Sequence, residues 1–100
     1  MAIPMRRTTL GPLLNEGARL AWRELESRGW DQARLRKELE AQVGRKISSG
    51  GLVKYLYCDR RPGVVWTEAF KSVLGIDPSA WYRTPEEPFL PPAAEPKDAA

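Results

Sequence analysis

The sequence lacks several features on which whole classes of function depend. Histidine is absent, which removes the commonest general base and the commonest metal ligand in proteins. Cys58 is the single cysteine, so neither an internal disulfide nor a multi-cysteine zinc site can form. No apolar run approaches the roughly 18 residues of a membrane span, and the N-terminus lacks the apolar stretch of a secretory signal. We therefore expect a cytoplasmic protein without a membrane partner, a metal or another cofactor.

The acidic residues do not suggest an enzyme either. Carboxylate catalysis needs a convergent pair of acids in a pocket, whereas the acids of this chain are scattered over helix faces that we expect to be exposed. With 100 residues the chain forms one small domain with a modest core. We expect no catalytic residue, and a function based on binding.

Basic residues are concentrated in the middle of the chain. The whole sequence carries 16 Lys and Arg against 13 Asp and Glu, but residues 32–61 carry eight against three. After residue 84 the balance reverses, with one basic residue against four acidic ones. A basic segment of this size is the kind of footprint that nucleic-acid phosphates attract, although charge alone fits a solvated surface equally well.

The first half of the chain predicts two helices after a flexible arm over residues 1–11. A helix over about 12–28 is indicated by Pro12 in its first turn, Gly29 just past its end, and an apolar stripe with helical spacing. The stripe consists of Leu14, Ala18, Ala21 and Leu25. Asp31 is a good N-cap for a second helix, which buries Leu35, Leu39 and Gln42 or Val43 and ends at Gly44.

The second half predicts three more helices and no strand. Ser48 or Ser49 can cap a third helix over about 49–58, which buries Leu52, Tyr55 and Leu56. A fourth helix over 64–74 points Val65, Ala69, Val73 and Phe70 inward, and Asp77 followed by Pro78 starts a short fifth helix that ends at about Trp81.

Residues 85–100 are rich in proline, alanine and acids, and we expect them to be disordered because they cannot bury enough apolar surface. Phe89 and Leu90 are the exception, since this apolar pair can dock on a surface. The domain itself is expected over residues 12–84. Trp22, Trp30, Trp66 and Trp81 fit packing better than base stacking in a core this small, and Cys58 fits a semi-buried residue.

Two helices joined by a short turn, the second of them slim at its start, have the layout of a helix-turn-helix. A helix that enters the major groove, about 12 Å wide, needs small residues at its N-terminal end and donors beside it. Ser48, Ser49 and Gly50 supply the slim end, and Lys54 projects from the exposed side. We expect these four residues to contact bases, with helix capping as the alternative role of the serines.

The order and spacing of several residues resembles the phage-repressor-like (Cro/repressor, XRE) helix-turn-helix family. The resemblance covers about residues 13–83 and rests on Gln32, Leu35, Leu39, Leu52, Tyr55, Asp59-Arg60-Arg61-Pro62, Leu74-Gly75-Ile76 and Trp81. It implies an all-α, compact five-helix lambda-repressor-like domain. Such a domain binds double-stranded DNA, regulates transcription as a repressor, and belongs to the bacterial or phage-encoded proteins of the nucleoid.

The resemblance and the charge pattern together give the expected phosphate contacts. In the family the residue at Gln32 holds the DNA backbone together with the N-terminus of the second helix. Around it we expect phosphate contacts from Arg45, Lys46, Tyr57, Arg60 and Arg61. Tyr57 can equally be a core residue, and one of Arg60 and Arg61 can instead brace the loop. A domain this small reads DNA best as a homodimer, with the fifth helix as a candidate contact, and Arg6 and Arg7 are candidates for the minor groove.

The chain departs from the family in two respects. The interval from Leu39 to Leu52 is about six residues longer than usual, which loop-closure entropy tolerates but which can re-aim the third helix. Cys58 and Arg36 stand where the family usually has a glycine and an alanine. A second functional hypothesis also stays open: a protein-interaction module, such as an antitoxin or a phage accessory factor, that binds a protein partner through the acidic tail.

Overall fold

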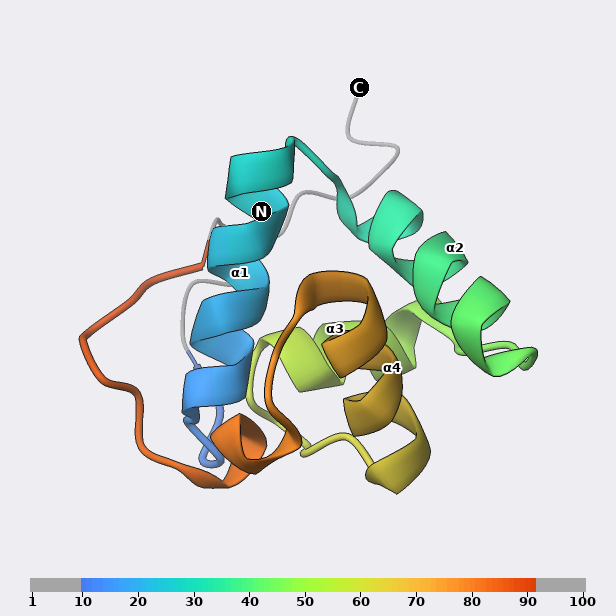
Figure 1. The fold of residues 1–100 in the computed structure, drawn as a ribbon. Helices are drawn as coiled ribbons and strands as arrows, with labels where there is room; N and C mark the ends of the chain where they lie inside the picture. The colour runs from blue at the N-terminus through green and yellow to red at the C-terminus, as the bar shows by residue number, and fades with distance from the viewer. Residues whose placement is uncertain (1–9, 92–100) are drawn as a thin grey trace, which may run out of the picture.

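The computed structural model describes residues 10–91, and in this range it contains helices and loops but no strand (Figure 1). Four α-helices are followed by one short 3-10 helix, and their bounds are α1 Glu16–Arg28, α2 Gln32–Val43, α3 Ser49–Leu56, α4 Val64–Leu74 and η1 Pro78–Tyr82. The all-helical prediction is therefore confirmed. The expectations for residues 1–9 of the arm, with Arg6 and Arg7, and for residues 92–100 lie outside the described residues, whereas Leu10 and Gly11 of the arm are held against the domain.

Three of the helices begin at the capping residues that the sequence indicated. The Asp31 carboxylate accepts from the Arg34 N–H at 2.8 Å, and the Ser48 hydroxyl accepts from the Gly51 N–H at 2.9 Å. Asp77 accepts from the Ser79 N–H at 2.8 Å and starts η1. Because η1 is a 3-10 helix of five residues, the fifth helix differs in type from the prediction.

α1 starts later than the sequence indicated. Its N-cap is Asn15, whose side-chain oxygen accepts from the Ala18 N–H at 2.8 Å, so Pro12 does not lie in the first turn. Leu14 precedes the helix and is 45% exposed, which removes it from the predicted apolar stripe. The residues before it are held by backbone instead: the N–H groups of Gly11 and Leu13 donate to the carbonyls after α3. These hydrogen bonds hold residues 11–13 against the backbone that follows α3, so α1 does not begin there.

α4 has the predicted bounds, but the set of its residues that faces the core differs from the predicted one. Ala69 and Phe70 are buried as expected, whereas Val65 is 43% exposed and so does not point inward. Thr67 and Leu74 take the buried positions in its place. The Thr67 hydroxyl donates to the Val64 carbonyl at 3.0 Å, so a polar residue can occupy the inner face because its hydroxyl has a partner.

The core lies between α1, α2, α3 and α4 and is closed by η1. Trp81 of η1 is fully buried, and its ring lies 4.7 Å from that of Phe70, centroid to centroid. α1 approaches this ring so closely that a Cβ atom on Gly17 would lie 2.2 Å from Trp81 Cδ2, so glycine is required there. The other tryptophans, Trp22, Trp30 and Trp66, are half-buried against the core. All four therefore contribute to packing.

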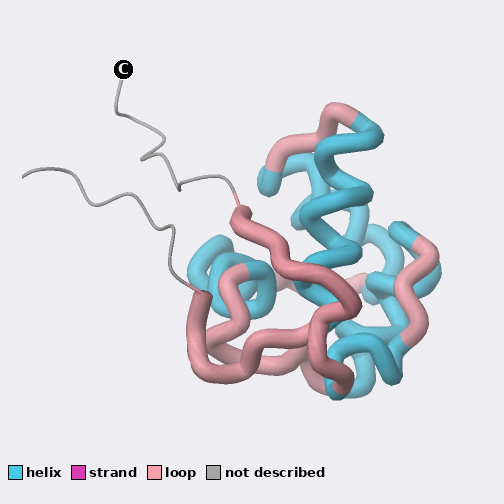
Figure 2. Tube along the Cα trace, turned by 90° about the vertical axis from the view of Figure 1, so that its left-hand side faces the viewer, coloured by secondary structure: helices cyan, strands magenta, loops and turns pink. Residues whose placement is uncertain are grey.

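The C-terminal segment, residues 84–91, crosses over α1 (Figures 1 and 2). The Glu86 N–H donates to Glu16 Oε1 at 2.8 Å, Phe89 is half-buried against the core, and Pro91 is buried. Over residues 85–91 the expectation of disorder therefore differs from the structure. Composition missed this contact because its acceptor lies 70 residues away in the sequence.

Glu16 and Arg19 form a buried ion pair at the start of α1. Glu16 is 1% exposed and Arg19 8%, and the guanidinium donates to the carboxylate through Nε at 2.7 Å and Nη2 at 2.5 Å. Arg19 Nη1 also lies 3.5 Å from Glu87 Oε1. The hydrogen bonds from Arg19 hold the pKa of Glu16 below its ordinary value. We call Glu16, Arg19, Glu86 and Glu87 the Glu16 cluster.

Candidate nucleic-acid interface

The outer face of α3 carries all four residues predicted to contact bases. Ser48, Ser49, Gly50 and Lys54 are exposed, whereas Leu52, Tyr55 and Leu56 are buried on the opposite side as predicted. A Cβ atom on Gly50 would have no neighbouring atom within 4 Å, so there is open space beside this residue at the start of α3. Of the two serines that could cap α3, Ser48 is the N-cap and Ser49 is the first residue of the helix.

A hollow of about 170 Å³ lies where the N-terminal ends of α2 and α3 meet. Gln32 and Arg36 of α2 line one side of it, and Ser49 and Leu52 of α3 line the other. Both helices begin beside this hollow, where Asp31 and Ser48 cap their first turns, and the positive ends of the two helix dipoles favour an anion here. Arg36 was not among the predicted contacts, although its position four residues after Gln32 places both on one helix face.

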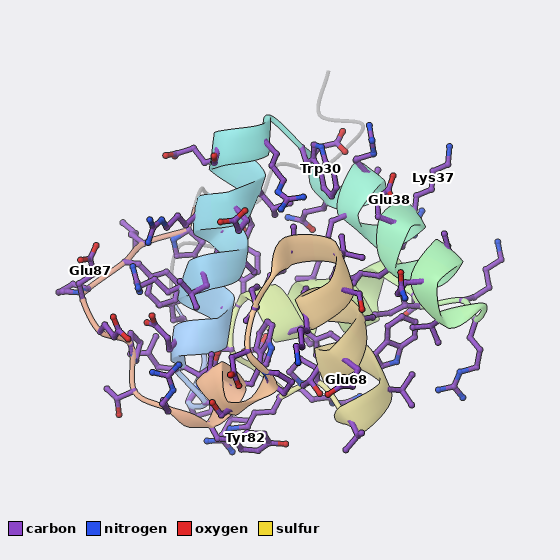
Figure 3. All side chains as sticks on the ribbon, viewed as in Figure 1. Trp30, Lys37, Glu38, Glu68, Tyr82 and Glu87 are labelled. Atoms are coloured by element: carbon purple, nitrogen blue, oxygen red, sulfur yellow. The ribbon has the colours of Figure 1, made fainter. Side chains whose placement is uncertain are left out.

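Several exposed cations outside this hollow, on the connection between α2 and α3, on α3 and on the loop after it, have no acidic partner in the described part of the chain. Arg45, Lys46, Lys54 and Arg60 are exposed, and none of them takes part in an ion pair within residues 10–91. Lys37 likewise has no such pair and projects from α2 away from the domain (Figure 3). We call Gln32, Arg36, Lys37, Arg45, Lys46, Ser48, Ser49, Gly50, Lys54 and Arg60 the α2–α3 face.

Two predicted phosphate contacts occupy other positions. Tyr57 is fully buried and packs edge-on against Trp22, with the ring centroids 5.4 Å apart, so the prediction that its hydroxyl reaches a phosphate is wrong for the folded domain. Arg61 is exposed, but its Nε donates to the Trp81 carbonyl at 3.0 Å and its guanidinium lies over the Tyr82 ring. Arg61 is thus the arginine that braces the loop, through a carbonyl rather than an acid.

The C-terminal end of α3 is fixed by contacts from distant parts of the chain. The Trp22 indole N–H donates to the Leu56 carbonyl at 2.8 Å, and the Gly11 N–H donates to the Tyr57 carbonyl at 2.7 Å. A Cβ atom on Gly11 would lie 2.7 Å from the Cys58 carbonyl oxygen, so this approach needs a glycine. The C-terminal end of α3 is therefore fixed by contacts from distant residues, whereas its N-terminal end is exposed.

Cys58 closes the turn after α3 in an unusual backbone conformation. Its φ is 65°, the single positive value among the non-glycine residues of the described chain, and its side chain is fully buried. The left-handed region favours glycine, which is the residue expected at this position from the resemblance. The thiol is more deeply buried than the semi-buried site that we expected.

Leu39 and Leu52 are both buried despite the long interval between them. α2 ends at Val43, and five residues, 44–48, connect it to α3. The turn thus takes up part of the interval without displacing either leucine from the core.

Residues 10–91 contain no cluster of acidic or cysteine side chains that could hold a metal ion, and none of their helices has the length and apolarity of a membrane span. Comparison of the chain with protein-family models, curated proteins and solved structures finds no match.

Proposed function

We propose that the chain is a sequence-specific regulator of transcription that binds double-stranded DNA through the α2–α3 face and acts as a repressor by occupying its operator. The observation that carries this proposal is the set of exposed cations without an acidic partner among the described residues, on the α2–α3 connection, on α3 and on the loop after it, together with the small residues at the start of α3. Cations without internal partners are available to neutralise phosphates, which supply most of the sequence-independent affinity for DNA. The helix order and the resemblance further support a lambda-repressor-like arrangement.

In the proposed complex the start of α3 enters the major groove. Ser49 and Gly50 leave room for the groove walls, and Lys54, one turn further on, reaches base edges such as the O6 and N7 atoms of guanine. The hollow beside Gln32 takes a backbone phosphate, with Arg36 as a charged donor. Arg45, Lys46 and Arg60 contact flanking phosphates, which fix orientation but carry no sequence information.

A homodimer is part of the proposal. A single domain of this size buries too little DNA surface for high specificity, whereas two copies read two half-sites about one helical turn apart. Tyr82 of η1 is 63% exposed and offers an apolar contact for the second copy.

Two lysine substitutions test base reading against simple charge attraction. Lys54→Ala is expected to weaken binding to the preferred duplex by about 1 to 3 kcal/mol more than binding to random DNA. Lys46→Ala, on the same face, is expected to weaken both by a similar factor. Dissociation constants for both duplexes measure the difference. Equal losses on both duplexes for Lys54→Ala would contradict base reading.

The alternative function, a protein-interaction module, is favoured by one observation on the C-terminal segment. Phe89 is docked against the chain's own core, while its neighbour Leu90 is 74% exposed. An exposed leucine beside a docked aromatic residue can contact a protein partner. Leu90→Asp tests this in the folded chain, because the substitution leaves the docked contacts in place. Loss of partner binding with unchanged DNA binding would support the alternative.

A further inference from the structure

The turn between α2 and α3 is held by a single residue of α2. The Glu40 carbonyl accepts from the Gly44 N–H at 2.7 Å, and Glu40 Oε2 accepts from the Ile47 N–H at 2.8 Å. Gly44 has a φ of 79°, so the chain reverses direction at this point in a left-handed conformation. One side chain therefore joins the last full turn of α2 to the far end of the connection.

Ile47 is fixed from two sides and leads directly into α3. Its side chain is buried, with 8% exposed, while its N–H is bonded to Glu40. The next residue is Ser48, whose hydroxyl caps α3. Because Ser48 and Ser49 follow Ile47 without an intervening residue, the position of the Ile47 backbone helps to fix where the start of α3 lies.

The Glu40 carboxylate also lies among the cations of the α2–α3 face. Glu40, Arg45 and Lys46 line one hollow of about 250 Å³ at the end of α2. Neither cation forms an ion pair with Glu40 within residues 10–91, so the carboxylate is committed to a backbone N–H. An anion at this place opposes phosphate binding without neutralising any one cation by direct contact.

We infer that Glu40 is a specificity-determining positioning residue for the proposed DNA binding. Its hydrogen bond to Ile47 holds the start of α3 in the orientation that reads bases, and its charge weakens sequence-independent binding. Both effects raise the preference for the operator over random DNA. The inference rests on the proposed function, and the two roles can be separated by substitution.

Three substitutions in the full-length chain separate the hydrogen bond from the charge. Glu40→Gln keeps an acceptor at the same reach and removes the charge. Glu40→Asp keeps the charge, but its side chain is one methylene shorter and withdraws the acceptor from Ile47. Glu40→Ala removes both. Dissociation constants are measured for the preferred duplex and for random DNA at two salt concentrations, after urea unfolding has shown which variants are folded.

The two conservative variants are expected to change different quantities. Glu40→Gln should bind random DNA several-fold more tightly at low salt while the preferred half-site sequence stays the same. Glu40→Asp should leave binding to random DNA unchanged and lower the ratio of operator to random affinity about tenfold. Glu40→Ala should show both changes, and if it does not fold the first two variants decide the matter.

The outcomes distinguish this inference from the proposed function. A wild-type chain without any sequence preference contradicts the proposed function, and the inference falls with it. A wild-type chain with a clear preference that Glu40→Asp retains in full contradicts the positioning role alone. Unchanged random binding in Glu40→Gln would contradict the role of the charge.

Discussion

Two charged regions lie on different sides of the molecule. In one the charges are paired around a buried ion pair, and in the other they are exposed and unpaired within residues 10–91. In the Glu16 cluster the arginine and the acids face each other, and Glu16 and Arg19 are withdrawn from solvent. On the α2–α3 face, cations such as Arg45 and Lys46 stand exposed without an acidic partner. In Figure 3, Glu87 on the C-terminal segment and Lys37 on α2 lie at opposite edges of the molecule. The two regions differ in whether their charges are paired, more than in how many charges they carry. Paired charges stabilise the fold, whereas unpaired charges are available to bind a ligand.

The largest effect is expected from breaking the buried pair. Arg19→Ala leaves the Glu16 carboxylate buried without its main partner, and it should lower the free energy of unfolding by about 3 to 5 kcal/mol. Arg23→Ala, on the same helix but exposed and outside every ion pair of residues 10–91, is the control and should change it by less than about 0.5 kcal/mol. Urea unfolding measures both. Equal effects would mean that the Glu16 cluster contributes nothing special.

Acid should weaken the Glu16 cluster selectively. Since the folded-state pKa of Glu16 lies below its ordinary value of 4.5, its contribution is present above that value and is lost as the pH falls through the folded pKa. Hydrogen bonds to a charged group of this kind contribute about 1.5 to 3 kcal/mol. Glu16→Gln should therefore be less stable at neutral pH and lose less stability between pH 5 and about pH 3. Identical acid profiles would contradict this assignment.

Substitution on the α2–α3 face should affect binding and spare the fold. Arg45→Ala is expected to change the free energy of unfolding by less than about 0.5 kcal/mol. It should weaken binding to every DNA sequence by a similar factor. It should also lower the slope of log affinity against log salt concentration by about 1. Lys71→Ala, which removes an exposed lysine in the last turn of α4, close enough to Asp77 to act on its charge, is the control and should leave the salt slope unchanged. An equal change of the salt slope in Arg45→Ala and Lys71→Ala would contradict a specific role of the α2–α3 face in DNA binding.

The smallest effect concerns the turn that anchors α3. Cys58→Ala keeps the strained positive φ, whereas Cys58→Gly relieves it at the expense of a more flexible unfolded chain. We expect the glycine variant to be more stable than the alanine variant by about 0.5 to 1 kcal/mol. Thermal unfolding of the two variants measures the difference. A more stable alanine variant would show that the backbone there carries no strain.

The helices were largely predictable because their signals are local. Asp31, Ser48 and Asp77 cap helices through bonds to residues two or three positions away, so sequence alone could identify them. The start of α1 was missed because Gly11 and Leu13 pair with the backbone beyond α3, and the docking of the C-terminal segment was missed because Glu86 meets Glu16. Contacts of this kind depend on the fold and leave no periodic pattern.

The candidate site shows the same division. Apart from Arg36 and Lys37, the residues of the α2–α3 face could be proposed from charge, small size and family resemblance, because an exposed role requires no partner within the chain. Tyr57 and Arg61 could not be placed, since both are engaged by distant residues, Trp22 and Trp81. Glu40 was overlooked because an acid among basic residues looks like a surface charge until its bond to Ile47 is seen.

The central claim is that the α2–α3 face reads DNA sequence. The most direct measurement is selection of bound duplexes from a randomised DNA library by the full-length chain at two salt concentrations. We predict an enriched two-fold symmetric motif that persists at the higher salt, as a dimer reading base edges requires. Binding without a motif that disappears at the higher salt, or no binding at either salt, would contradict the claim.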